Sequence, residues 1–426
     1  MKSIYIGTGI VGSDISADIA IDAEARARHV YAIGQTGTGK SVLLENMIAQ
    51  DMRNGTGLCF IDPHGTSAEA LITKIPPERK DDLIFVDLSD ASQPVGLNFM
   101  TGIIENDRAL WANNLVAAFK HIYGDDSWGP RMEYIFVQSV RSLMDSDLTL
   151  LALPRLFTDE AFRNLVIRRV RDPFVKYQFW REQFGPWSKK FGPELTSPID
   201  NKVGTFLSSP QIRAIVSQRQ NTIDLRQIMD QRKILIVALR KGRIGEMPAS
   251  LMGAVLVSAI AQTAMSRLDN TTDEGALVPF ALYCDEFQNY ATSGFPLVLS
   301  EARKFKLMLT LAHQGLSQIP ERVMNSVFDN CGTLISFRIG VNDAPLIAKA
   351  FNVQSESAFL GLPNFQARLR PLERGNPSDA ILVNTYPPPA PLHGRTREFI
   401  AHSGRRFGRG FAAVSAAIER FLRRIS

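Results

Sequence analysis

The sequence predicts an α/β fold in which a mostly parallel β-sheet is flanked by helices, with an inserted all-α subdomain and an N-terminal β-hairpin. The first observation is a series of short apolar runs, several of them apolar on both faces, which is typical of strands buried in a parallel sheet. The second is that helical patterns lie between many of these runs, as in a doubly wound sheet. The runs are Val30–Ile33, Leu58–Ile61, Leu83–Val86, Ile234–Leu239, Phe280–Cys284, Leu307–Ala312, Thr333–Phe337 and Ile381–Val383.

Composition indicates an ordinary intracellular protein. The 426 residues are enough for two or more domains, and the chain contains 45% hydrophobic and 21% charged residues. No secretory signal is evident, and the longest membrane-like run, Leu251–Met265, is too short to span a bilayer, so we interpret it as a core helix. The three cysteines lie in apolar runs and indicate buried residues in a reducing compartment. We expect a cytoplasmic protein without an integral membrane segment, and leave open its peripheral attachment at the inner membrane.

The N-terminal residues contain a glycine pattern with two interpretations. Gly7 to Gly12 reads GxGxxG, which would indicate a dinucleotide fold if a helix followed it. Instead, Ala17, Ile19 and Ile21 alternate with polar residues, as in a strand. We therefore predict a β-hairpin over residues 3–22, within an N-terminal segment 1–27.

Residues 104–195 interrupt the alternation of strands and helices, because apolar residues recur there at helical spacing and no strand run appears. The segment would divide the main domain into residues 28–103 and 196–386. Its second half mixes Arg and Lys with aromatic residues, such as Arg181 beside Tyr177 and Trp180. Such a mixture could bind a nucleic acid single strand by stacking and charge. We favour the simpler interpretation, a helical core with solvated basic faces.

The C-terminal segment, residues 387–426, is predicted to contain a spacer, a linker and a helix. Pro387–Pro391 is a stiff proline-rich spacer, and a basic linker with glycines follows Arg395. Phe411, Val414, Ile418, Phe421 or Leu422, and Ile425 then follow helical spacing, with Arg420, Arg423 and Arg424 alongside. The segment from Arg395 onward contains eight Arg and two Glu, so its net charge (8 − 2 = +6) exceeds the net charge of +5 of the whole chain. This basic amphipathic helix could dock on a partner, a membrane surface or the parent body.

A phosphate-binding motif follows the Val30–Ile33 run. Gly34 to Ser41 reads GQTGTGKS, which fills every fixed position of G-x-x-x-x-G-K-S, and a helical pattern follows it. Glycines let backbone N–H groups converge on phosphate oxygens, Lys40 would contact the outer phosphates, and Ser41 would be a ligand of Mg²⁺. The predicted binding residues are Gly34, Gln35, Thr36, Gly37, Thr38, Gly39, Lys40, Ser41 and Val42.

Hydrolysis also requires acidic residues, and the Phe280–Cys284 run ends in Asp285-Glu286. Ligands gather at the C-terminal ends of strands in open α/β sheets. Asp285 would hold Mg²⁺, mostly through water, and Glu286 would act as general base toward the attacking water. A solvent-facing acidic turn is the alternative, but a complete phosphate loop in the same chain favours the catalytic interpretation.

These motifs, with a strand that ends in Gln314, resemble the FtsK/HerA superfamily of ring-forming, RecA-like DNA-pumping ATPases. The likeness is greatest to the type IV secretion coupling proteins of conjugation, which also carry an all-helical insertion, a strand ending like Phe60–Gly65 and a turn like Gly96–Asn98. The resemblance implies that Gln314 contacts the γ-phosphate or water. It also implies that Arg303 reaches the nucleotide of a neighbouring subunit, with Lys304 and Lys306 as rivals and a plain surface charge as the alternative.

The resemblance further implies ATP and Mg²⁺ as cofactors, DNA as a partner, and a homo-oligomer, expected to be a hexamer. A relaxase or secretion-channel proteins would be additional partners, and Arg240, Lys241 and Arg243 would lie on a loop facing the pore. Coupling proteins usually begin with transmembrane helices, and we expect none in this sequence. A HerA-like DNA-processing ATPase and a nucleotide-switched adaptor for protein cargo therefore stay open. A GTPase switch is disfavoured because Asn201-Lys202 is followed by Val-Gly and not by the base-reading x-Asp.

Overall fold

The computed structural model describes all residues except 1, 12–14, 271–276, 374 and 424–426. The predicted residues Gly12, Arg424 and Ile425 lie outside the described part. The contacts within the chain define two compact units, which we call the sheet unit and the helical unit. The sheet unit comprises Met1–Asp87, Leu225–Leu239 and Ile260–Ser403, and the helical unit comprises Leu88–Asp224, Arg240–Ala259 and Gly404–Ser426.

The sheet unit contains an eleven-stranded sheet in the order β2-β1-β13-β10-β9-β3-β8-β7-β4-β6-β5 among the described residues. The seven strands from β9 to β5 run parallel, which confirms the predicted mostly parallel sheet. Strands β3, β4, β6, β7, β8 and β9 are buried along their whole length, as apolar runs predict. These seven are β3 (Val30–Ile33), β4 (Gly57–Asp62), β5 (Leu83–Asp87), β6 (Ile234–Ala238), β7 (Phe280–Cys284), β8 (Leu307–His313) and β9 (Thr333–Ser336).

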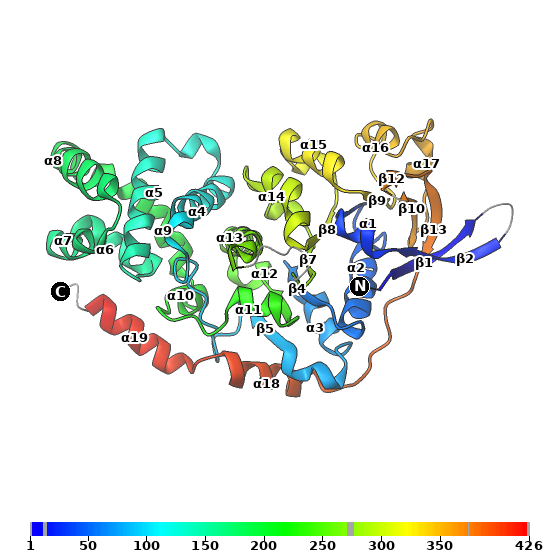
Figure 1. Cartoon of the computed structure of the whole chain (residues 1–426), viewed down its shortest axis with the longest axis horizontal. Coiled ribbons are helices and arrows are strands. Elements are labelled where there is room, and N and C mark those ends of the chain that lie inside the picture. Colours follow the sequence, from blue (N-terminus) through cyan, green and yellow to red (C-terminus); the bar gives the residue numbers. More distant parts are fainter. Residues whose placement is uncertain (1, 12–14, 271–276, 374, 424–426) are drawn as a thin grey trace. The chain divides into compact units, whose positions relative to one another are not determined.

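The other four strands form an antiparallel extension at one edge. The predicted hairpin is present as β1 (Ile4–Val11) and β2 (Ile15–Ile21), and Figure 1 shows it beside β13 (Ile381–Thr385). Strand β10 (Gln366–Arg370) pairs with both β13 and β9. The predicted Ile381–Val383 strand is present and belongs to this antiparallel part of the mostly parallel sheet. The physical reason is visible in its burial, because alternate residues of β13 are exposed, as in a half-buried antiparallel strand.

Helices cover the sheet. Helix α2 (Lys40–Arg53) follows the phosphate loop and buries Leu43, Leu44, Met47 and Ile48 against it. Further α-helices among the described residues of this unit are α1 (Ala23–Ala27), α3 (Thr66–Ile72), α11 (Leu225–Asp230), α14 (Phe295–Glu301), α15 (Glu321–Asn330), α16 (Ala344–Ala350) and α17 (Ser357–Leu360). A short two-stranded sheet, β11 (Leu372–Glu373) with β12 (Asn376–Pro377), completes it.

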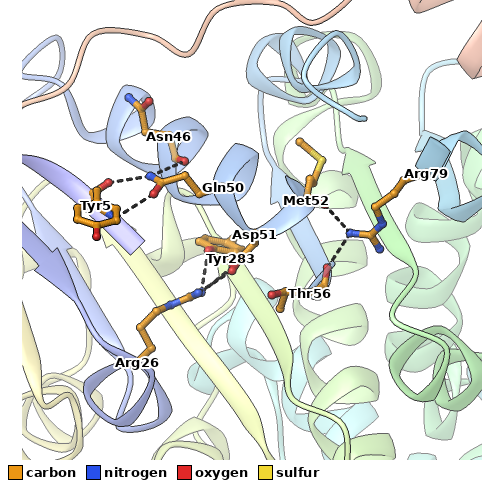
Figure 2. Close-up of polar contacts among 9 residues, drawn as sticks. All are labelled: Tyr5, Arg26, Asn46, Gln50, Asp51, Met52, Thr56, Arg79 and Tyr283. Atoms are coloured by element: carbon orange, nitrogen blue, oxygen red, sulfur yellow. Dashed lines mark hydrogen bonds and ion pairs between the residues drawn. The ribbon is translucent and has the colours of Figure 1, made fainter. Parts of the chain in front are cut away.

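Polar contacts tie α2 to its surroundings at three points, which Figure 2 shows. Gln50 exchanges two hydrogen bonds with the backbone of Tyr5, at 2.9 and 2.7 Å, and so fixes the hairpin to the helix. Arg79 donates to the carbonyl oxygens of Met52 and Thr56 at the C-terminal end of α2. Asp51 forms a buried ion pair with Arg26, to which the Tyr283 hydroxyl is added. These contacts set the position of α2 relative to β1 and β7.

The helical unit has a core rich in aromatic residues. Phe179, Trp180 and Phe184 are buried, with the Trp180 and Phe184 rings 4.8 Å apart between centroids, as the simpler interpretation of the segment expects. Phe174 and Tyr177 are instead 52% and 50% exposed. Its described helices include α4 (Arg108–Tyr123), α5 (Pro130–Asp145), α6 (Leu153–Thr158), α7 (Glu160–Arg169), a π-helix (Phe174–Phe184), α8 (Gly185–Phe191), α9 (Ser197–Ser208), α10 (Pro210–Val216) and α12 (Lys241–Ile244).

Two helices, α13 (Glu246–Met265) and α18 (Thr396–Phe407), contribute residues to both units. The predicted core helix lies within α13. The stretch Glu246–Leu268 is long and apolar enough to cross a membrane by length and composition alone, and 72% of its apolar window is buried in the structure. A buried core helix of this kind passes the same test, so the stretch is weak evidence for a membrane span.

The C-terminal segment differs from the prediction in one respect. The expected linker after Arg395 is helix α18, because Phe399 and Ser403 are buried and the Ser403 hydroxyl accepts a hydrogen bond from the Phe85 backbone N–H at 2.8 Å. The predicted amphipathic helix is present as α19 (Phe411–Arg423). It packs on its own chain, since Val414 is buried and Phe421 lies 6.3 Å from Phe162 between ring centroids.

Candidate nucleotide-binding and hydrolysis site

The loop between β3 and α2 depends on its glycines. Gly37 and Gly39 have φ values of +78° and +120°, which L side chains rarely adopt. A Cβ atom at Gly34 would lie 2.6 Å from the Cβ of Phe337, and one at Gly39 would lie 3.1 Å from the rings of Phe337 and Phe365. The three glycines therefore allow the positive φ angles of the loop and its close packing against Phe337 and Phe365, which residues with a Cβ would prevent. Such a loop at a helix N-terminus offers backbone N–H groups to an anion.

Lys40 begins α2 and folds back over the loop. Its ammonium group donates to the carbonyl oxygens of Gly34 and Gln35, the second at 3.0 Å. Burial lowers the pKa of Lys40, while the carboxylates of Glu286 and Asp285 act in the opposite direction. The ammonium group thus lies within the loop where a phosphate chain would bind, close enough to the acid pair to be influenced by it.

Ser41 and Asp285 are 244 residues apart in the sequence and are in direct contact. The hydroxyl of Ser41, in the first turn of α2, donates to Oδ2 of Asp285, which follows β7, at 3.1 Å. Burial, together with the charges of Glu286 and Asp62, raises the pKa of Asp285 to about 6. Three carboxylates, those of Asp285, Glu286 and Asp62, thus lie near one another, and the site has a surplus of negative charge.

This arrangement fits a magnesium ion. Mg²⁺ is usually held by one or two carboxylates together with substrate phosphates and waters, and not by a cage of protein ligands. Among the described residues, no group of three His, Cys, Asp or Glu side chains forms such a cage. Ser41 and Asp285 offer one hydroxyl and one carboxylate beside the phosphate loop. The surplus negative charge around Asp285 would be neutralised by the ion.

Glu286 has an unusual backbone. Its φ and ψ are 50° and 51°, in the left-handed region, which is uncommon outside glycine and is concentrated at functional sites. Its two carboxylate oxygens accept hydrogen bonds from the side-chain amides of Gln314 at 2.6 Å and Gln288 at 2.7 Å. Gln314 follows β8, the parallel neighbour of β7. The structure thus brings together Lys40, Ser41 and the three predicted polar residues at the ends of β7 and β8.

Arg303 lies elsewhere. It belongs to a short 3-10 helix, Ala302–Phe305, that precedes β8, whereas Gln314 follows β8. A seven-residue strand spans about 23 Å, so Arg303 lies at the opposite end of the parallel strands from the phosphate loop of its own chain. Its rival Lys304 is paired with Glu301 at 2.6 Å. The candidate pore residues Arg240, Lys241 and Arg243 lie in the helical unit, at α12.

Sequence reasoning missed three residues near the site. Asp62 ends β4, next to β7, and accepts hydrogen bonds from the backbone N–H groups of His64 and Ala68. Its signal was present, because it follows an apolar run as Asp285 does. Arg338 and Phe365 contact the phosphate loop from the β9 and β10 side, through Gln35 and Thr38. No local pattern marks either of them, because they reach the loop only through strand pairing.

A glycine-rich phosphate loop and an acid pair that meet at the C-terminal end of a parallel sheet are typical of the RecA-like class of P-loop nucleotide-binding domains. No family model and no curated protein matches the sequence. Solved structures do match. TrwBdeltaN70, a bacterial conjugative coupling protein, shares 14% identity at a TM-score of 0.64, over 92% of this chain and 96% of that chain. VirB4 of Thermoanaerobacter pseudethanolicus shares 11% identity at a TM-score of 0.56, over 91% and 97%.

TrwB has been solved with the ATP analogue ADPNP, with the GTP analogue GDPNP, and with ADP and Mg²⁺. At such low identity the similarity establishes a common fold. The resemblance to coupling proteins, predicted from the motifs, is confirmed at the level of the fold.

Proposed function

We propose that this chain is an ATP-hydrolysing ring motor that translocates DNA, in type IV secretion or conjugative transfer. One observation carries the proposal: Ser41 contacts Asp285, and Glu286 contacts Gln314, at the C-terminal ends of adjacent parallel strands. These are the parts that phosphoryl transfer to water requires, because catalysis there consists mainly of positioning and charge stabilisation. The fold shared with TrwB and VirB4 supports DNA transfer as the process.

The residues have separate roles in this proposal. Lys40 and the backbone N–H groups of the loop would bind the outer phosphates, and Ser41 and Asp285 would hold Mg²⁺, which neutralises charge on the phosphate oxygens. Glu286 would orient a water molecule and accept its proton. Gln314 donates a 2.6 Å hydrogen bond to one carboxylate oxygen of Glu286 and so fixes the orientation of the carboxylate toward the water.

Arg303 supports a ring. The length of β8, about 23 Å, separates Arg303 from the phosphate loop of its own chain. If Arg303 acts on a nucleotide, that nucleotide is therefore bound to another copy of the chain. We propose a homohexamer in which Arg303 offsets the charge that develops on the transferred phosphoryl group of the neighbour. A relaxase or secretion-channel proteins are the proposed partners, as the resemblance to coupling proteins implies.

The helical unit offers a surface that favours nucleic acid. Residues 160–190 contain eight basic and three acidic side chains. Two rings, Phe174 and Tyr177, are exposed on the π-helix, and the Arg181 guanidinium lies 5.1 Å from the centre of the Tyr177 ring. Exposed rings that alternate with arginines bind unpaired bases by stacking and phosphates by charge. We propose that this face, which we call the basic aromatic face, contacts DNA.

The test is ATP hydrolysis by the purified chain with and without single- and double-stranded DNA. We expect stimulation by DNA, weaker at high salt because phosphate contacts are screened. The Lys40→Ala variant should lose hydrolysis in both conditions. Hydrolysis that persists in this variant would refute the site assignment. Slow hydrolysis indifferent to DNA, with tight binding of a protein cargo, would favour the nucleotide-switched adaptor, for which the helical unit would be the docking surface.

A further inference from the structure

The loop that ends in Phe365 is fixed directly on the phosphate loop. The backbone N–H of Phe365 donates to the carbonyl oxygen of Thr38 at 2.8 Å. The Phe365 carbonyl oxygen accepts two hydrogen bonds from Thr385, at 2.8 Å from its N–H and 2.9 Å from its hydroxyl. Its φ is +64°, in a region that a residue with a bulky side chain rarely adopts. The backbone at Phe365 is therefore held in a costly conformation by three hydrogen bonds.

The side chain gains little burial from this conformation. The Phe365 ring is 46% exposed, although one edge lies against Gly39. A strained backbone that presents an exposed aromatic ring is unusual in a residue whose role is packing alone, because burial of the ring would be the compensation.

Arg338 is arranged beside the same loop. Its guanidinium donates to the carbonyl oxygen of Leu362 and to Oδ1 of Asn364, both at 3.0 Å, and lies 3.4 Å from Oε1 of Gln35. Its backbone carbonyl accepts from the Gln35 N–H at 2.8 Å. A planar cation and an exposed ring are thus fixed on one side of the phosphate loop.

The direction of a bound nucleotide follows from the strand order. The proposed metal ligand Asp285 and the base Glu286 lie on the β8 and β7 side of β3, so the terminal phosphate points to that side. Phe365 and Arg338 lie on the other side of β3, after β9 and before β10. A nucleotide whose phosphates run along the loop then carries its ribose and base toward Phe365 and Arg338.

We propose that Phe365, assisted by Arg338, is the platform for the base of the bound nucleoside triphosphate; this inference rests on the proposed nucleotide site. The ring stacks on the face of the base, and the guanidinium adds cation–π attraction. Stacking uses the face of the base and does not read its edge, so purines are exchanged with little change in affinity. We expect ATP and GTP to bind within about threefold of each other, because stacking is tolerant of base identity.

The experiment compares ATP with inorganic tripolyphosphate, which has the phosphates and no base, by calorimetric titration with Mg²⁺ on the full chain. Phe365→Ala should weaken ATP binding about tenfold, a typical effect of losing one stacked base, and leave tripolyphosphate binding unchanged. Phe365→Trp should restore ATP affinity, and its fluorescence should be quenched by ATP and not by tripolyphosphate. Leu346→Ala, which removes an exposed apolar side chain from α16 of the same unit, is the matched control.

The outcomes separate the inference from the proposed function. Equal losses for ATP and tripolyphosphate in Phe365→Ala would mean that the residue only supports the phosphate loop, and would overturn the inference. Unchanged ATP affinity in that variant would overturn it as well. If the original chain binds neither ligand, the proposed nucleotide site itself is refuted. If only the Lys40→Ala variant fails to bind both ligands, the result agrees with the proposed nucleotide site and with the platform.

Discussion

Replacing Asp51 by Asn should destabilise the sheet unit strongly. Asp51 on α2 is 0% exposed and Arg26 on α1 is 1% exposed, and two hydrogen bonds of 2.7 Å join them. The Tyr283 hydroxyl donates to Asp51 at 2.5 Å and accepts from Arg26 at 2.8 Å (Figure 2). Burial alone lowers the pKa of Arg26, but Tyr283 and Asp51 more than offset this and raise it above the ordinary value. Arg26 is therefore charged in the folded protein, and it does not avoid the cost of burying its charge by losing a proton.

The magnitude follows from what each substitution leaves behind. Asp51→Asn leaves a buried guanidinium without its counter-charge, which typically costs about 3–5 kcal/mol. The double variant Arg26→Met/Asp51→Leu removes both charges and keeps apolar volume, and such replacements are often neutral or stabilising. We therefore expect the single variant to be less stable than the double variant. For a unit of this size, the loss corresponds to a decrease in Tm of about 6–20 °C.

Thermal unfolding followed by calorimetry measures the effect on the transition of the sheet unit. Because the chain has two units, the transitions must be assigned before free energies are compared. A single variant that melts with the original chain, or a double variant that is as unstable as the single one, would refute the reasoning. Tyr283 lies two residues before Asp285, so ATP hydrolysis by the double variant also reports whether the cluster positions the acid pair.

Three further predictions concern the site and the basic aromatic face. With a pKa of about 6, Asp285 gains a proton as the pH falls, so Mg²⁺-dependent ATP binding should weaken below pH 6 by up to about tenfold per pH unit. The weakening should be smaller in Asp285→Asn, where only the protonation of ATP itself remains. Glu286→Gln should retain ATP binding and lower kcat by about 10²–10⁴, as loss of a general base does. Phe174→Ala/Tyr177→Ala should weaken single-stranded DNA binding by tenfold or more, measured by fluorescence anisotropy, and leave DNA-independent ATP hydrolysis unchanged.

The sequence predicts the parallel part of the fold well, for a physical reason. A strand buried on both faces is an uninterrupted apolar run, and Val30–Ile33 and Phe280–Cys284 have the predicted bounds in the structure. The phosphate loop and the acid pair follow such runs directly, so their positions at strand ends could be predicted locally. The contact between Ser41 and Asp285 is then a consequence of the order of the strands.

Other features depend on contacts that no local pattern encodes. A linker with glycines was predicted after Arg395, yet Gly404 lies inside α18, and a Cβ at Gly408 would be 2.5 Å from the backbone carbonyl oxygen of Gln93. Gly408 is there for a close approach and not for flexibility. Likewise, Phe365 reaches the phosphate loop because β10 pairs with β9, and β9 with β3. An exposed phenylalanine in a turn gives no sign of this in the sequence.

Strand β8 links the two ends of the proposed mechanism. Gln314 follows its C-terminal end and holds Glu286, while Arg303 precedes its N-terminal end, beyond reach of the same nucleotide. A fully buried parallel strand between β3 and β7 is a rigid connection. In the proposed ring, β8 therefore connects the residue that holds the base of one site to the arginine that serves the next copy.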